Sequence, residues 1–335
     1  MAVGPAIGVA AVVALVLAID PANFGRSIER FNPVLLAPII AVSVGYFVVQ
    51  GIRWHFLLVD VGVRMRMRDV VLLTLAGQST ALLPLGELTR SVFVTQVSHA
   101  EFGAVVAAET VQELLYTITL ILFAVPGLLI FPNAIAGIIV ILAGIGFVMV
   151  AMSWCRVYRY LRWVVACTPL LRRALHQVDE LHNDLVVLLR KPGTLGWMWL
   201  SALQAAAMIT MLWLVAAAIA PGALDWKAAA LVFAVSNVAG LLSLIPGGLG
   251  AYEGSVIGLL MGLGVAPGAA AAVAIVQRLA SQGIATGVGF AAYAVARRKL
   301  GVSSLGAVTI RGAPQRAPVA AEDARDVVGV SAAGG

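Results

Sequence analysis

Long apolar runs separated by short polar breaks make up most of the chain. A helix needs about 20 consecutive apolar residues to cross the hydrocarbon core of a bilayer. Runs close to that length or longer recur from the first residues almost to residue 300, at 2–19, 34–58, 102–131, 134–153, 195–220, 227–245 and 268–296. The pattern predicts an all-α polytopic membrane protein with about eight spanning helices.

Two further features of this pattern are breaks made of proline and glycine. The apolar pieces on either side of each break are short for a tilted full crossing. We therefore expect 70–99 and 227–264 to form re-entrant hairpins, which enter the membrane and leave it on the same side. The residues expected to break the helices are Pro84 and Gly86 in the first hairpin, and Pro246, Gly247, Gly248 and Gly250 in the second.

The two broken segments resemble each other in sequence. When the helices after the breaks are aligned on a shared glutamine, four pairs of positions match: Gln112 with Gln277, Gly103 with Gly268, Val111 with Val276, and Leu114 with Leu279. The first segment is entered from the cytoplasm and the second from outside, so the pattern predicts an inverted repeat with halves of about 1–131 and 134–300. Such repeats recur in transporters, where broken helices mark the binding site.

Basic residues indicate the orientation, because Lys and Arg concentrate in cytoplasmic loops. Basic groups occur at Arg64–Arg68, within 154–192 and at Arg297–Lys299. We expect all three, and both chain termini, on the cytoplasmic side of a bacterial-type plasma (inner) membrane. Leucines at three- and four-residue intervals predict that 154–192 forms an amphipathic helix on the cytoplasmic leaflet. The organisation is thus one transmembrane domain, 1–301, followed by a disordered tail, 302–335.

Composition narrows the class of protein further. Of the 335 residues, 61% are hydrophobic and only 11% are charged, against about 25% charged in a typical soluble domain. This excludes an ordinary soluble protein, a disordered chain and a nucleic-acid binder. The net charge of +6 is explained by basic residues at the membrane boundary. Neither a metal-ligand spacing nor an enzyme motif is visible, so we expect no catalytic residues, no cofactor and no metal.

Six charged residues fall in or beside the apolar segments, where a charge at the bilayer centre costs about 2.5–3.5 kcal/mol. We predict that the arginines hold a lipid phosphate, because a planar guanidinium can bind phosphate through two parallel hydrogen bonds. The carboxylates would line a polar translocation path, where they bind an amine or carry a proton. The alternative is that these groups form buried pairs that only hold the helices together. The residues are Arg90 and Arg278 for phosphate, and Glu87, Glu109, Glu113 and Glu253 for the path.

Two smaller patterns carry structural predictions. Arg53 beside Trp54 is typical of an anchor at the membrane–water interface. Gly254, Gly258 and Gly262 recur every four residues, which predicts a face where helices pack closely.

At these residues the chain resembles a known family, the lysylphosphatidylglycerol synthase transmembrane region, a flippase-like domain. The resemblance covers roughly residues 5–300. It rests on three motifs: Ala76-Gly77-Gln78, Leu83-Pro84-x-Gly86-Glu87-x-x-Arg90, and Pro246-Gly247-Gly248-Leu249-Gly250-x-x-Glu253 followed by Arg278. The family often carries Glu-Arg and, three residues later, Asp after the first break, whereas this chain has Gln112, Glu113 and Tyr116.

The resemblance implies a role in moving or handling a lipid, such as a phospholipid, a polyprenyl-linked lipid or a hopanoid, between leaflets. Because residues 300–335 are too few for a transferase domain, we expect a stand-alone membrane protein without the synthase. One alternative is a non-transporting scaffold that presents lipid to a separate lipid-synthesis enzyme. Another, an intramembrane lipid-modifying enzyme, lacks a visible nucleophile or metal set. The expected partners are a membrane lipid and possible further copies of the chain, with no nucleic acid.

Overall fold

A computed structural model describes residues 21–80, 88–129, 193, 196–243 and 248–302. They belong to one compact unit, residues 1–303. Within these ranges the chain is helical and contains no strand, which confirms the all-α class. The expected segments 2–19, 134–153 and 154–192, and the tail 302–335 apart from Val302, lie outside the described residues.

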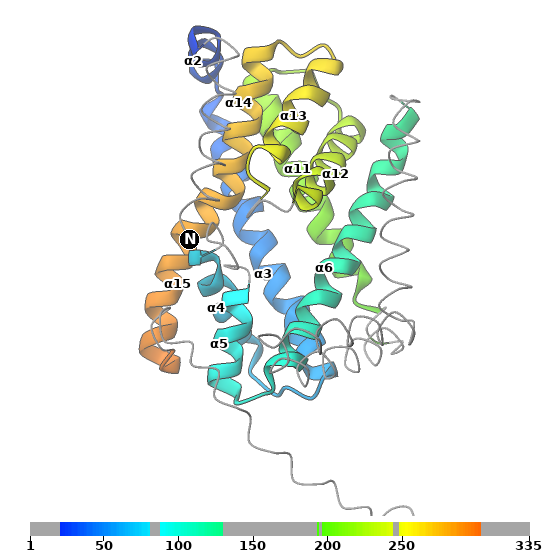
Figure 1. Cartoon of the computed structure of the whole chain (residues 1–335). Coiled ribbons are helices and arrows are strands. Elements are labelled where there is room, and N and C mark those ends of the chain that lie inside the picture. The colour runs from blue at the N-terminus through cyan, green and yellow to red at the C-terminus, as the bar shows by residue number, and fades with distance from the viewer. Residues whose placement is uncertain (1–20, 81–87, 130–192, 194–195, 244–247, 303–335) are drawn as a thin grey trace, which may run out of the picture. The chain divides into compact units, whose positions relative to one another are not determined.

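Among the described residues, four apolar helical segments are long enough to cross a bilayer: Pro33–Asp60, Phe102–Gly127, Trp199–Ile219 and Pro267–Leu300. They contain α3 (Leu36–Asp60), α6 (Phe102–Ala124), α11 (Met198–Ile219), and the pair α14 (Pro267–Arg278) and α15 (Ile284–Leu300). A π-helical turn, Leu279–Gly283, joins α14 to α15, and the two form one long orange column in Figure 1. The chain is therefore a multi-pass membrane protein. The total of about eight spans and the inverted repeat stay predictions.

Shorter helices lie on either side of each expected break. Before and after the first break are α4 (Met67–Gly77) and α5 (Thr89–Ser98), with 11 and 10 residues. Around the second break are α12 (Trp226–Leu242) and α13 (Ala251–Gly262), with 17 and 12 residues. All four are shorter than the ~20 residues of a typical crossing. Four of the residues expected to break the helices, Pro84, Gly86, Pro246 and Gly247, lie outside the described residues.

Gly248 and Gly250 are described, and both occupy the left-handed region, with φ of 63° and 85°. A residue with a Cβ is strained there, so the chain needs glycine to turn into α13. Glu253 completes this turn, because its Oε2 accepts a hydrogen bond from the Gly250 backbone N–H at 2.6 Å.

Glycine also lets the members of each helix pair approach. A Cβ on Gly77 of α4 would lie 2.7 Å from the Cβ of Arg90 on α5, and a Cβ on Gly240 of α12 would lie 3.4 Å from the Cβ of Tyr252 on α13. The glycines expected to pack closely behave differently: a Cβ on Gly254 or on Gly258 would meet nothing within 4 Å. The prediction of close packing at those two positions was wrong.

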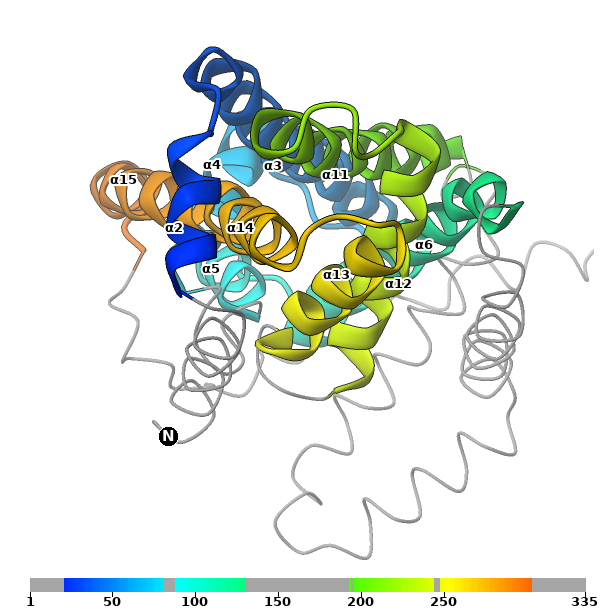
Figure 2. The same cartoon turned by 90° about the horizontal axis from the view of Figure 1, so that it is seen from above.

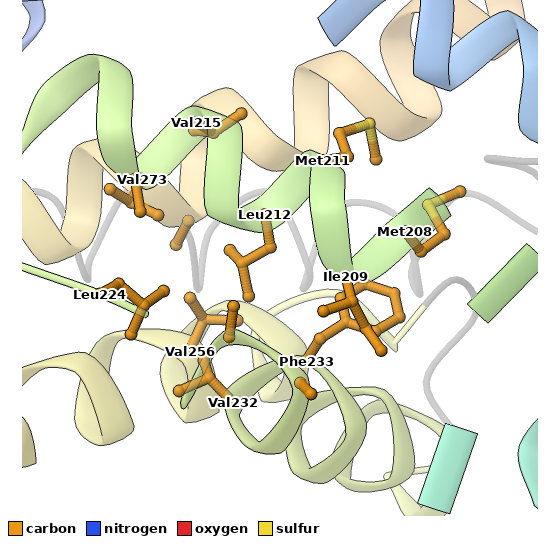
Figure 3. Packing of buried hydrophobic residues seen from close by; sticks show 14 of the residues in the cluster. Met208, Ile209, Met211, Leu212, Val215, Leu224, Val232, Phe233, Val256 and Val273 are labelled. Atoms are coloured by element: carbon orange, nitrogen blue, oxygen red, sulfur yellow. The ribbon is translucent and has the colours of Figure 1, made fainter. Parts of the chain in front are cut away.

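Helix α3 packs against α4, α6, α11 and α15 (Figure 1). Seen from above, α13 lies between α12 and α14 (Figure 2). The largest hydrophobic cluster joins α11 to these helices, and Figure 3 shows Ile209 and Leu212 of α11 facing Val232 and Phe233 of α12. This packing holds α6, α13 and α14, whereas α5 packs in a second cluster through Phe93 and Val94.

Pro21–Glu29 forms helix α2, which packs on α14, and its Phe24 and Ile28 pack against the largest hydrophobic cluster. One expectation about polar positions was wrong. Arg53 and Trp54 are not at an interface, because both side chains are fully buried inside the protein. Their neighbours in space come from distant parts of the chain, as described below.

Candidate functional site

The first group of intramembrane charges joins α5 to α6. Nε of Arg90 donates a hydrogen bond to Oε1 of Glu109 at 2.9 Å, and Nη2 of Arg90 donates one to Oε1 of Glu113 at 3.1 Å. Glu109 and Glu113 lie one turn apart on α6, so one guanidinium reaches both carboxylates. The hydroxyl of Ser91 donates to the second oxygen of Glu109. These four residues are the Arg90 cluster.

The Arg90 cluster is closed around its arginine. The Arg90 side chain is 5% exposed and that of Glu109 is 8% exposed. The guanidinium carbon also lies 5.1 Å from the centre of the Trp54 ring on α3, a cation–π distance. Three helices therefore contact this guanidinium, and its Nη1 is buried without a hydrogen-bond partner among the described residues.

The second group of charges joins α13 to α14. Nε of Arg278 lies 3.0 Å from Oε1 of Glu253, although the two atoms are not aligned as a hydrogen bond. The guanidinium carbon of Arg278 lies 5.3 Å from the centre of the Tyr252 ring. The Tyr252 hydroxyl in turn donates to Oε1 of Gln277 at 2.9 Å. Tyr252, Glu253, Gln277 and Arg278 are the Arg278 cluster.

The arginine of the Arg278 cluster is more exposed than the arginine of the Arg90 cluster. Glu253 is 1% exposed, but Arg278 is 17% exposed. Glu253 is held by the first turn of α13 through its bond to Gly250 N–H. The carboxylate is therefore fixed, while the guanidinium beside it retains an accessible face.

Arg53 of α3 is a functional candidate that the sequence interpretation placed wrongly. Its Nη1 donates to Oε1 of Gln204 on α11 at 2.9 Å, and its Nη2 donates to the backbone oxygen of Gln112 on α6 at 2.7 Å. Both acceptors are neutral, and Arg53 is within electrostatic range of Glu113 and Arg90. A signal was present in the sequence, because an arginine inside an apolar run is as expensive there as Arg90 or Arg278.

Five of the six expected charged residues thus fall into two clusters. Arg90, Glu109 and Glu113 come together in one, and Glu253 and Arg278 in the other. Glu87 lies outside the described residues. Ser91, Tyr252 and Gln277 complete the clusters. The small side chain of Ser91 and the aromatic side chain of Tyr252 gave no signal in the sequence. Among the residues that the structure describes, no group of three or more His, Cys, Asp or Glu side chains is placed to hold a metal ion.

Comparison with known proteins identifies the family. The family model described as lysylphosphatidylglycerol synthase TM region matches residues 1–289, which include both clusters. The chain belongs to this family. It is also similar to a UPF0104 membrane protein of Methanothermobacter thermautotrophicus, with 22% identity over 309 residues that cover 85% of this chain and 90% of the relative. Both findings fit a stand-alone member of the lysylphosphatidylglycerol synthase TM region family, and the family is consistent with a lipid-related role in the membrane.

Proposed function

We propose that the protein moves a membrane lipid between leaflets and that the lipid phosphate binds Arg278. The observation that carries this proposal is the accessible guanidinium of Arg278, 17% exposed within the apolar segment Pro267–Leu300. An arginine in such a segment is costly unless it faces a polar interior or a ligand. Family membership supports a lipid as that ligand.

The loose pairing of Arg278 with Glu253 suits a ligand that must bind and leave. A phosphate can form two aligned hydrogen bonds with a guanidinium, whereas the Glu253 contact is not aligned as one. Glu253 stays fixed by Gly250 when the phosphate binds. When the phosphate leaves, the same carboxylate compensates the charge of the arginine, so neither state leaves an isolated cation in the membrane.

Arg90 is a weaker candidate for phosphate than the sequence suggested. A phosphate that took the two nitrogens now bonded to Glu109 and Glu113 would displace both carboxylates. Removing one partner of a buried pair costs about 3–5 kcal/mol, which exceeds what a transient ligand usually returns. We therefore assign Arg90 to holding α5 against α6, and Arg278 to the lipid.

The test is lipid movement in liposomes that contain the purified protein and fluorescent phospholipids. We expect the wild type to transfer label between leaflets and Arg278→Gln to slow transfer at least tenfold, while Glu29→Gln, which changes an exposed residue of α2, leaves transfer unchanged. Elution volume and thermal unfolding in detergent show whether each variant is folded. A folded Arg278→Gln variant with wild-type transfer would remove Arg278 from the site, and a wild type without transfer of any tested lipid would refute the function.

The proposal includes a place and an orientation in the cell. We place the protein in the plasma membrane with both termini in the cytoplasm, since the basic groups Arg64–Arg68 and Arg297–Lys299 belong on that side. A reporter fused after residue 335 that is active only in the cytoplasm checks this orientation.

A further inference from the structure

Helix α6 has an exposed face that divides into a polar and an apolar stripe. At about 100° per residue, Thr110, Glu113 and Thr117 fall within about 60° of one another around the helix axis. All three are at least partly exposed. The neighbouring sector carries Leu114, Ile118 and Leu122, which are also partly or fully exposed. We call the two sets the polar stripe and the apolar stripe of α6.

The position of Glu113 makes the polar stripe unusual. The residue lies near the middle of the apolar segment Phe102–Gly127, and its side chain is 46% exposed. A carboxylate facing hydrocarbon at that depth costs about 2.5–3.5 kcal/mol. An exposed carboxylate at mid-span therefore indicates that water or a polar group reaches this face of α6. The apolar stripe beside it carries no such group and suits lipid chains.

The polar stripe offers mainly hydrogen-bond acceptors. The hydroxyls of Thr110 and Thr117 donate to backbone oxygens of the same helix, Val106 at 2.8 Å and Glu113 at 2.8 Å. Their donors are thus occupied, while their oxygen lone pairs stay available. Together with the Glu113 carboxylate, they would accept hydrogen bonds from hydroxyl or ammonium groups.

Two buried arginines, Arg90 and Arg53, contact α6 from the protein interior at the turn that carries Glu113. Arg90 donates to one oxygen of Glu113, and Arg53 donates to the backbone oxygen of Gln112, the residue before it. Two contacts from the protein interior therefore fix the turn of α6 that carries Glu113. The charge is balanced on the inner side, and the remaining part of the carboxylate faces outward.

We infer that the polar stripe of α6 contacts the headgroup of a membrane lipid whose headgroup carries hydrogen-bond donors, while its chains lie along the apolar stripe. The polar stripe would contact the headgroup and the apolar stripe would contact the acyl chains. Both stripes lie at mid-span, where the surrounding hydrocarbon excludes a headgroup. The choice of a lipid as occupant rests on the proposed function. The inference that water reaches the polar stripe does not depend on the proposed function. It rests on the exposure of Thr110, Glu113 and Thr117.

Cysteine labelling tests the exposure without any transport assay. In a variant with Cys155→Ser and Cys167→Ser, we compare Thr110→Cys and Thr117→Cys with the controls Leu114→Cys and Ile118→Cys, which lie on the same turns. We expect a charged, membrane-impermeant maleimide to label the two polar-stripe positions at least tenfold faster than the controls in liposomes. Equal rates at all four positions would overturn the inference.

Lipid competition tests the occupant. Short-chain phospholipids with glycerol, ethanolamine or choline headgroups are added during labelling of Thr117→Cys. We expect the glycerol and ethanolamine lipids, which carry O–H or N–H donors, to slow labelling more than the choline lipid, which has none. Equal effects of all three lipids would contradict the assignment, and a larger effect of one donor-bearing lipid identifies the preferred donor. If the wild type moves no lipid, the proposed function fails, but these rates still decide the role of the stripe.

Discussion

The Arg90 cluster and the Arg278 cluster use the same pair of residue types and differ in how tightly they close. Arg90 donates aligned hydrogen bonds to two carboxylates of α6 and lies against Trp54. Nε of Arg278 lies 3.0 Å from Oε1 of Glu253 without hydrogen-bond alignment, and the Arg278 side chain is 17% exposed. The more buried arginine joins two helices, whereas the more exposed one, Arg278, can be reached by a ligand.

Aligned positions carry opposite charges in the two clusters. The alignment that places Gln112 on Gln277 places Glu113 on Arg278. In the first half the more exposed group of the cluster is the acid, Glu113, at 46%; in the second it is the base, Arg278, at 17%. On the predicted repeat, the two aligned positions present an acceptor, Glu113, and a donor, Arg278. We therefore treat the stripe of α6 and the phosphate site as separate sites.

The largest effect on stability is expected from Glu109→Gln. This change removes one of the two carboxylates that compensate the buried Arg90, so we expect the free energy of unfolding to fall by about 3 kcal/mol. Thermal unfolding in detergent measures the loss, with Glu29→Gln as the exposed control. An unfolding midpoint equal to that of the wild type would mean that the Arg90 cluster does not hold α5 and α6 together.

The next effect concerns the glycines that close the two helix pairs. Gly77→Ala places a Cβ 2.7 Å from the Cβ of Arg90, whereas Gly240→Ala places one 3.4 Å from the Cβ of Tyr252. We expect the first change to cost about 2 kcal/mol by overpacking and the second to cost less. Gly258→Ala, with nothing within 4 Å, is the control. A larger loss from Gly240→Ala than from Gly77→Ala would reverse the comparison.

Arg278→Lys distinguishes the effect of the positive charge from the effect of the guanidinium geometry in the Arg278 cluster. Lysine keeps the positive charge but loses the planar fork that binds phosphate through two bonds. We expect lipid transfer in liposomes to fall about tenfold, which corresponds to ~1.4 kcal/mol, with little change in unfolding temperature. Arg90→Lys is expected to show the opposite pattern, with a lower unfolding temperature and slower transfer only in proportion to unfolded protein. Identical patterns for the two variants would contradict the separate roles.

The smallest expected effect is that of Tyr252→Phe. The change removes the hydroxyl that donates to Gln277 at 2.9 Å but keeps the ring beneath Arg278. We expect a loss of about 1 kcal/mol in the free energy of unfolding and near-normal lipid binding. Tyr252→Leu, which also removes the ring, should weaken binding further, and equal binding by both variants would exclude a role for the ring.

The lengths of the apolar segments and the positions of the charged residues within them could be predicted from the sequence, because both depend on local composition. The spanning segments around α3, α6, α11 and α14–α15 followed from apolar runs, and the costly charges followed from their placement within them. Which charge pairs with which, and how openly, depends on the packing of helices far apart in the chain.

Arg53 shows why the rest was not readable. An arginine beside a tryptophan near the end of an apolar run is typical of an interface, but its partner Gln204 is 151 residues away in the chain. The glycines show the same limit, since the regular spacing of Gly254 and Gly258 gave a false signal, whereas the isolated Gly77 makes the close contact. A periodic pattern indicates a face, but only the neighbouring helix determines whether that face is packed.

We propose that Arg278, and not Arg90, binds the lipid. Native mass spectrometry of the purified protein tests this assignment most directly. Wild type, Arg278→Gln, Arg90→Gln and Glu29→Gln are compared for the amount of lipid that stays bound to folded protein. We expect Arg278→Gln to lose the bound phospholipid, while folded Arg90→Gln and Glu29→Gln retain it. Retention by Arg278→Gln together with loss from folded Arg90→Gln would contradict the assignment.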